Sequence, residues 1–225
     1  SKGFERKTLE LPSEIIQSFF PGSSIAVLSG PSHAEEVSLG LPTTVVVAAG
    51  EEDICARIQL IINSSSFRVY TSSDARGVEV AGASKNVIAL AAGISDGLGY
   101  GDNARAALVC RGASEITRLG AALSCARETF AGLSGIGDLV ATCTSAHSRN
   151  HTVGRRIGQG ESLEEILASS DKVAEGVETT RSLHQLAKKI SIELPITTEV
   201  YRVLFEGKAP AAAVADLMGR ELKRE

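Results

Sequence analysis

The stretch from Val78 to Ile94, VEVAGASKNVIALAAGI, is the part of the sequence that most limits how the chain can fold. Almost all of its residues are small or apolar, and a helix that is apolar on nearly every side has no face to turn toward water. We therefore predict a buried helix here, around which the other elements pack. One charged residue, Lys85, lies in its middle and is followed by Asn86.

Lys85 is unusual at such a position, because removing an ammonium group from water is costly. Lysine is almost never fully buried unless it is paired or functional. Desolvation also lowers the pKa of a lysine, which makes Lys85 a candidate proton donor or acceptor near neutral pH. From this helix alone two other interpretations stay open: a side chain that extends to the end of the helix, and a structural ion pair.

Composition excludes several classes of protein. The chain has 225 residues and a net charge of −4, and it is long enough to bury a real core. Its basic residues are dispersed, which argues against a nucleic-acid-binding surface, and no apolar run approaches the ~20 residues of a membrane span. The four cysteines form no C-x-x-C pair, so we expect free thiols and a cytoplasmic protein. They are Cys55, Cys110, Cys125 and Cys143.

The first 73 residues alternate between strand and helix patterns, which is the signature of an α/β sheet. Ser32 followed by Glu35 has the spacing of a capping box at the start of one helix. Buried strands are predicted at 24–29 and 43–49, a third strand at 67–71, and further helices at 11–20 and 51–62.

After Ser73 convincing strand patterns end and helices follow one another, the first of them capped by Asp74. Residues 132–137 are expected to form a glycine-rich turn. Helices are predicted at 103–119, 148–158, 162–167, 175–190, 197–205 and 211–222. We therefore expect an α/β domain over 1–73 and an all-α domain over 74–225.

Two motifs suggest a binding site by their pattern but lack the structural context that such a site needs. Gly99-Tyr100-Gly101 begins a G-x-G-x-x-A pattern, but a dinucleotide loop needs a strand before it, and here a helix precedes it. We interpret it as a connection between helices. Cys143, His147 and His151 follow one another at four-residue steps, but the residues between the first two read as a loop, so we expect no metal site.

The run Ser148-Arg149-Asn150 is a candidate anion site. A serine cap and a guanidinium at a helix N-terminus place free backbone N–H groups beside a positive charge, which is the chemistry that holds a phosphate. A surface arginine beside an ordinary cap is the alternative. Asp138, between a glycine turn and an apolar run, is a candidate ion-pair partner for a buried cation.

Together these short motifs resemble one enzyme family. In order, they are Lys2-Gly3, Gly30-Pro31-Ser32-His33-Ala34, Lys85-Asn86, Ser95-Asp96-Gly97-Leu98-Gly99-Tyr100-Gly101-Asp102-Asn103, Gly135-Ile136-Gly137-Asp138-Leu139, Ser148-Arg149-Asn150 and Val173-Ala174-Glu175-Gly176. The sequence resembles the NAD(P)-dependent glycerol-3-phosphate dehydrogenases, most of all their bacterial branch. The resemblance implies a Rossmann domain followed by a helical substrate domain. It also implies an oxidoreductase that interconverts sn-glycerol 3-phosphate and dihydroxyacetone phosphate and supplies phospholipid synthesis.

The resemblance implies a role for each matched residue. Lys85 matches the general acid/base, which takes the C2 hydroxyl proton during oxidation and returns it during reduction. The residues that match the substrate pocket are Lys2, Gly30, Ser32, Lys85, Asp138, Ser148, Arg149 and Asn150. Those that match contacts to the cofactor, NAD or NADP, are Lys2, Ala34, Arg149, Val173 and Glu175.

The chain departs from the family at its beginning. The family's glycine-rich cofactor loop precedes its Lys-Gly motif, and this sequence has no such loop. We therefore expect the α/β part to be the second half of a Rossmann-like sheet, and the chain to be a fragment that is inactive alone. A homodimer is compatible with the resemblance. The preference between NAD and NADP does not follow from these residues, because the discriminating position belongs to the absent half.

Two other functions stay open. A related dehydrogenase could act on a hydroxy acid or a sugar, but a carboxylate substrate would need anchors other than Arg149. A non-catalytic helical interaction module predicts a central helix that is uncharged or exposed, and Lys85-Asn86 among alanines argues against it.

Overall fold

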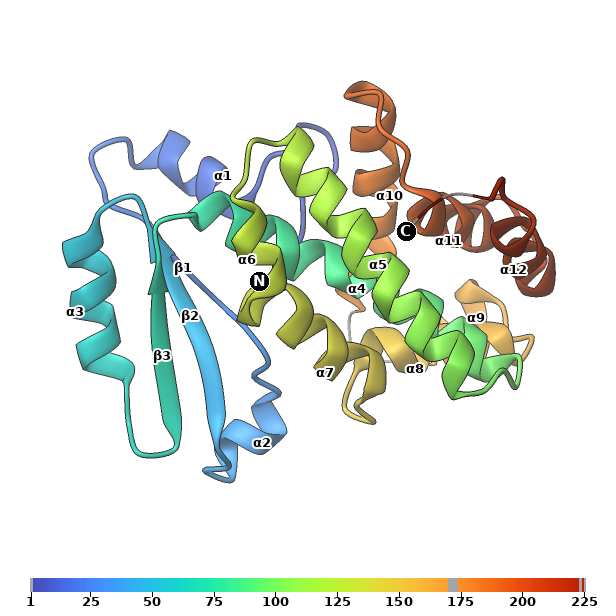
Figure 1. Ribbon diagram of the computed structural model, residues 1–225, viewed down its shortest axis with the longest axis horizontal. Helices are drawn as coiled ribbons and strands as arrows, with labels where there is room; N and C mark the ends of the chain where they lie inside the picture. Colours follow the sequence, from blue (N-terminus) through green and yellow to red (C-terminus); the bar gives the residue numbers. More distant parts are fainter. Residues whose placement is uncertain (1, 170–173, 223, 225) are drawn as a thin grey trace.

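The computed structural model describes residues 2–169, 174–222 and 224 (Figure 1). Its smaller part is a three-stranded sheet with the order β1 (Ala26–Ser29), β2 (Thr43–Ala49) and β3 (Phe67–Ser72). The strands β2 and β3 are parallel, whereas β1 pairs antiparallel with β2. The helices of this part are α1 (Pro12–Phe19), α2 (Ala34–Ser38) and α3 (Glu52–Ile62).

The central strand β2 is buried on both faces. Successive side chains of a strand point to opposite sides. Val45 and Val47 therefore pack with Val69 under α3, while Val46 packs on the other face against Val78. The TTVVVAA run is continuously apolar because neither face meets water, as is typical of sheets with parallel strands.

Two details of the α/β part differ from the sequence prediction. The first strand is not buried, because β1 lies at the sheet edge and Leu28 is 51% exposed. The capping box is also absent. His33 is the N-cap of α2, and the Ser32 hydroxyl turns back to donate to the Gly30 carbonyl at 3.2 Å. Gly30, at the start of this loop, has a φ of +130°, a conformation that favours glycine.

The larger part is helical and is built around α4 (Ala75–Gly97). Figure 1 shows α4 running through the centre of this part, with α5 (Asp102–Ala122) in front of it. Nearly every residue of α4 from Gly77 to Ser95 is buried, as the sequence predicts. The Asp74 carboxylate caps the helix by accepting from the Gly77 N–H at 2.9 Å. The predicted fold class, an α/β part followed by helices, is confirmed.

The remaining elements cover α4 from several sides. Residues 132–137 were expected to form a glycine-rich turn, but Leu133–Gly137 forms the π-helical turn η1, which runs directly into α7. A side chain at Gly135 would place its Cβ 2.0 Å from the Phe130 carbonyl oxygen, so only glycine fits this tight path. The other helices are α6 (Arg127–Ala131), α7 (Asp138–Thr144), α8 (Arg149–Gly158), α9 (Leu163–Ala168), α10 (Glu175–Lys189), α11 (Pro195–Phe205) and α12 (Pro210–Met218).

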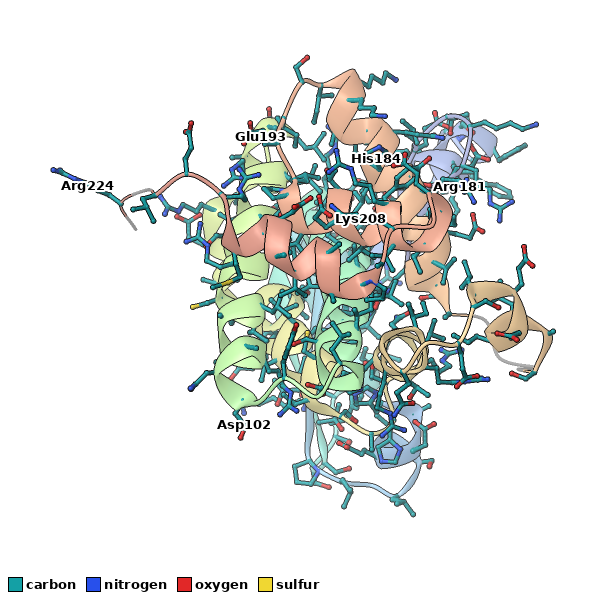
Figure 2. The ribbon with its side chains drawn as sticks, turned by 90° about the vertical axis from the view of Figure 1, so that its right-hand side faces the viewer. Asp102, Arg181, His184, Glu193, Lys208 and Arg224 are labelled. Atoms are coloured by element: carbon teal, nitrogen blue, oxygen red, sulfur yellow. The ribbon has the colours of Figure 1, made fainter. Side chains whose placement is uncertain are left out.

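The last helices attach through polar and aromatic contacts. Figure 2 shows His184 of α10 and Lys208, which lies between α11 and α12. The His184 ring stacks on Tyr201 with 3.9 Å between centroids. Lys208 pairs with Glu199 and with Asp216, so one ammonium links α11 to α12. The helix α12 ends at Met218, earlier than predicted.

No helix in the described ranges is long and apolar enough to cross a membrane. The predicted division of the chain at residue 74 stays a prediction.

The contact between α4 and α8 depends on glycines that face each other from the two helices. A Cβ at Gly93 would lie 2.1 Å from the His151 carbonyl oxygen, and one at Gly154 would lie 2.1 Å from the Leu90 carbonyl oxygen. Gly97 and Gly158, one turn further along each helix, are equally crowded, at 2.2 Å and 2.3 Å from backbone oxygens. We call these four glycines the glycine seam. The two backbones touch directly along it.

Replacing Gly154 with alanine should destabilise the fold. Alanine favours a helix, but its methyl group would overlap the backbone of α4, and overpacking of this kind costs about 1–3 kcal/mol. Urea unfolding followed by circular dichroism measures the free energy of unfolding. The matched control is Gly50→Ala, since a Cβ there meets no atom within 4 Å; equal stability of the two variants would contradict a close-packed seam.

Candidate active site

A cavity of about 500 Å³ lies where the α/β part meets the helical part. The N-terminal segment, the loop between β1 and α2, the middle of α4, and the starts of α7, α8 and α10 all contribute to its wall. Every predicted site residue that the structure describes lines it: Lys2, Gly30, Ser32, Ala34, Lys85, Asp138, Ser148, Arg149, Asn150 and Glu175. Val173 lies outside the described residues.

Two lysines share one buried carboxylate in this cavity. The Lys85 Nζ donates to Asp138 Oδ1 at 2.6 Å, and the Lys2 Nζ donates to Asp138 Oδ2 at 2.6 Å. The side chains of Lys85 and Asp138 are only 7% and 3% exposed. Of the interpretations left open for Lys85, the ion pair is present, and Asp138 is the partner of a buried cation, as its sequence context indicates.

The surroundings of Lys85 shift its pKa downward to about 8. Burial is the largest cause, because it penalises the charged form, and the positive charge of Lys2 acts in the same direction. The carboxylate of Asp138 opposes both. Lys85 therefore exchanges its proton in the range where a general acid/base works best, near the operating pH.

Thr142 is a third partner of Lys85 that the sequence did not reveal. The Lys85 Nζ donates to Thr142 Oγ1 at 2.6 Å, and this hydroxyl donates to the Asp138 carbonyl oxygen at 2.6 Å. Thr142 follows Asp138 by four residues on α7, so the two side chains lie on one helix face. The four-residue spacing could have marked Thr142 as a neighbour of Asp138. That signal was not used, because the turn expected at 132–137 left the start of the following helix undefined.

The first turn of α8 forms another wall of the cavity. Ser148 caps it, and its Oγ accepts from the His151 N–H at 3.2 Å. Asn150 is buried, and its Oδ1 accepts from the Gly176 N–H at 2.9 Å, which ties this turn to the start of α10. Arg149, between them, is exposed and lines the cavity. The predicted helix start and its serine cap are confirmed.

Both cationic and acidic side chains line the cavity. Lys2, Lys85 and Arg149 all line it, and the helix N-terminus at Ser148 adds a partial positive charge. Asp138, the most buried acid, is paired with both lysines, and Glu35 and Glu175 also line the wall. A phosphate group and a hydroxyl that exchanges a proton with Lys85 would match this arrangement.

The glycine pattern and the Cys143, His147 and His151 set do not form the sites that their spacing suggests, although His147 lines the cavity. Gly99–Gly101 connects α4 to α5, as predicted. Cys143 is in α7 and His151 is in α8, so they do not share a helix. Burial raises the pKa of the Cys143 thiol to about 12. Across the part of the chain that the structure describes, no group of three or more metal-ligating side chains occurs, and the four cysteines are free.

Replacing Asp138 with asparagine should lower the pKa of Lys85 further, below about 8. The charge and the hydrogen bond of Asp138 both raise that pKa, so their loss leaves burial and Lys2 to act alone. The pH dependence of Lys85 labelling by an amine-reactive reagent, followed by peptide mass spectrometry, measures the shift. Asp216→Asn, which changes an exposed pair with Lys208, is the control, and equal titration in both variants would contradict the prediction.

Comparisons with known proteins identify the family to which the chain belongs. Residues 74–215 match the family profile described as the NAD-dependent glycerol-3-phosphate dehydrogenase C-terminus, and residues 1–55 match the profile of its N-terminus. A glycerol-3-phosphate dehydrogenase [NAD(P)+] from Geobacter sp. (strain M21) is 53% identical, and the match covers 100% of this chain and 68% of that protein. One from Geobacillus kaustophilus is 54% identical, with 100% and 66% covered.

Solved structures give the same result. The crystal structure of glycerol-3-phosphate dehydrogenase from Coxiella burnetii is similar with a TM-score of 0.94 and 41% identity, over 97% of this chain and 67% of that chain. The structure of a glycerol-3-phosphate dehydrogenase from Saccharomyces cerevisiae is similar with a TM-score of 0.86 and 28% identity, over 97% and 66%. The chain belongs to the family of NAD-dependent glycerol-3-phosphate dehydrogenases.

Proposed function

We propose that this chain forms the substrate pocket and the acid/base machinery of an enzyme that interconverts sn-glycerol 3-phosphate and dihydroxyacetone phosphate with NAD(P)(H). The observation that carries the proposal is a buried lysine with a pKa of about 8, set at the wall of a cavity that Lys2, Arg149 and the start of α8 also line. The relatives bear the name of this activity. Glycerol 3-phosphate supplied in this way would serve phospholipid synthesis.

Lys85 moves the proton of the reaction. In the oxidation its neutral amine takes the proton of the C2 hydroxyl, and in the reduction its ammonium returns it to the C2 oxygen. Asp138 and Thr142 hold the Nζ in place by two hydrogen bonds of 2.6 Å each. A lysine fixed in this way starts close to the reactive geometry, which lowers the entropic part of the barrier.

The first turn of α8 binds the phosphate in this proposal. Arg149 supplies a guanidinium, which pairs well with phosphate oxygens. The N–H groups at the start of α8 supply further donors. Gly30 and Ser32, from the loop between β1 and α2, also line the cavity, and in this proposal they contact the substrate.

The residues present fit the nicotinamide end of the cofactor, which supplies or accepts the hydride. Lys2, Ala34, Arg149 and Glu175 line the same cavity as Lys85. His33, beside Ala34, also lines this cavity, and its Nε2 has no hydrogen-bond partner among the described atoms. No glycine-rich turn that could bind the pyrophosphate follows a strand among the described residues. The position that distinguishes NAD from NADP is expected in that part of the fold, so the proposal keeps both cofactors.

A non-catalytic interaction module would require a central helix that is uncharged or exposed. The helix α4 is buried and carries the charge of Lys85, which argues against that alternative. The phosphorylated small molecule remains the partner in this proposal. Free cysteines fit a reducing compartment such as the cytoplasm. Association into a homodimer stays a prediction.

The kinetic tests need a complete enzyme, which is a chimera that joins this chain to the glycine-rich part of the cofactor domain of the Geobacter sp. relative. Its activity with dihydroxyacetone phosphate is itself the first test of the proposed function. An inactive but folded chimera that binds NADH would count against it.

Lys85→Met should lower turnover roughly 10²–10⁴-fold, because it removes the proton carrier while keeping the volume of the side chain. In the parent enzyme the oxidation needs neutral Lys85, so its rate should rise with pH and level off above about 8, the pKa of this group. The reduction needs the ammonium and should fall over the same range. Initial rates measured from pH 6 to 10 in both directions test this. Turnover in the variant close to that of the parent would rule out Lys85 as the acid/base.

Arg149→Ala should weaken binding of the phosphorylated substrate. A hydrogen bond to a charged group contributes about 1.5–3 kcal/mol, which corresponds to a rise in KM of roughly ten- to a hundredfold. The measurement is KM for dihydroxyacetone phosphate at saturating cofactor. Arg181→Ala is the control, because that arginine lies over the Phe205 ring on α11 and does not line the cavity. An unchanged KM in Arg149→Ala would exclude the phosphate role.

A further inference from the structure

We propose that His151 is a positioning residue, which holds the first turn of α8 through its hydrogen bond to Asp96, so that Ser148, Arg149 and Asn150 face the phosphate. This inference rests on the proposed function, since it concerns how the same pocket keeps its shape. His151 itself is absent from the lining of the cavity. It acts through the residues that precede it.

The side chain of His151 is bonded to α4 directly and is linked to α5 through Asp96. Its Nε2 lies 2.8 Å from Asp96 Oδ2, near the end of α4. Arg105 of α5 holds the same carboxylate with its Nη2, which lies 3.0 Å from Asp96 Oδ1 and 3.0 Å from Oδ2. The His151 and Asp96 side chains are only 15% and 13% exposed. A chain of contacts thus runs from α5 through α4 to α8.

The backbone of His151 is fixed as well. Its N–H donates to the Ser148 Oγ at 3.2 Å and so forms the cap of α8. Its carbonyl oxygen lies against Gly93, at the first contact of the glycine seam. Because Arg149 is two residues before His151, a rotation of this turn would move the guanidinium directly.

The seam meets the first turn of α8 at the His151 carbonyl oxygen, which lies against Gly93. Gly154 and Gly158 lie further along α8 and fix the rest of the helix on α4. The turn from Ser148 to His151 extends beyond them toward the cavity. Side-chain hydrogen bonds that tie this turn to other helices include that of Asn150 Oδ1 with the Gly176 N–H of α10 and that of His151 Nε2 with Asp96 of α4. Losing the bond to Asp96 should let the turn shift relative to α4.

The test compares His151→Ala with His151→Gln in the complete enzyme. Glutamine can place an amide N–H near the position of Nε2 and restore the hydrogen bond to Asp96, whereas alanine cannot. The readout is kcat/KM for dihydroxyacetone phosphate divided by kcat/KM for dihydroxyacetone, which lacks the phosphate. This ratio isolates the phosphate contact from general damage to the enzyme.

We expect His151→Ala to lower the ratio roughly 10-fold, since misplacement of a binding group by about 1 Å can cost up to a hundredfold, and His151→Gln to recover most of the loss. Arg156→Ala is the control on the same helix, because Arg156 pairs with Glu161 away from the cavity; its ratio should not change. If His151→Ala does not fold, His151→Asn, whose shorter side chain cannot reach Asp96, replaces it.

The inference is overturned if His151→Ala leaves the ratio unchanged, or if glutamine and alanine lower it equally. Arg149→Ala in the same assay separates this result from the proposed function. A lower ratio in Arg149→Ala with no effect in His151→Ala means that only the positioning role is wrong. No effect in either variant means that the phosphate site itself is wrong.

Discussion

The desolvation of one ammonium group is the constraint on which the arrangement of the site depends. Lys85 lies on a helix that is buried along most of its length, and an unpaired charge there would cost several kcal/mol. The Asp138 carboxylate offsets this cost only if α7 lies against α4, at a distance set by hydrogen bonds of 2.6 Å. Lys2, at the start of the sequence, is held by the same carboxylate. One buried charge therefore fixes where three distant segments meet.

A balance of opposite influences gives Lys85 its chemistry. If burial acted alone, the amine would stay neutral and could not return a proton. If Asp138 acted alone, the ammonium would be stabilised and could not accept one. The second lysine weakens the effect of the carboxylate without breaking the pair. The resulting pKa of about 8 keeps both forms of Lys85 populated near neutral pH, which a reversible reaction requires.

Much of the fold and part of the site could be predicted from the sequence. The all-round apolar character of 78–94 was enough to identify the buried helix, and the cost of burying Lys85 was enough to mark it as paired or functional. The partner Thr142 could not be identified with confidence, because its role depends on how α7 meets α4, across 57 residues of sequence. The capping box at Ser32 is absent because α2 begins one residue later than expected, with His33 as its N-cap. The turn expected before Asp138 was wrong in kind, since Leu133–Gly137 is a π-helical turn that continues into α7 instead of breaking the chain.

The glycine seam has a consequence for how the site forms. Each glycine in a helix costs about 0.8–1 kcal/mol relative to alanine, and Gly93, Gly97, Gly154 and Gly158 are divided between α4 and α8. Either helix alone would therefore be a weak helix in water, and only docking recovers the loss. The general acid/base on one helix and the anion-binding turn on the other should consequently become ordered in a single cooperative step. A partly folded chain should hold neither half of the pocket.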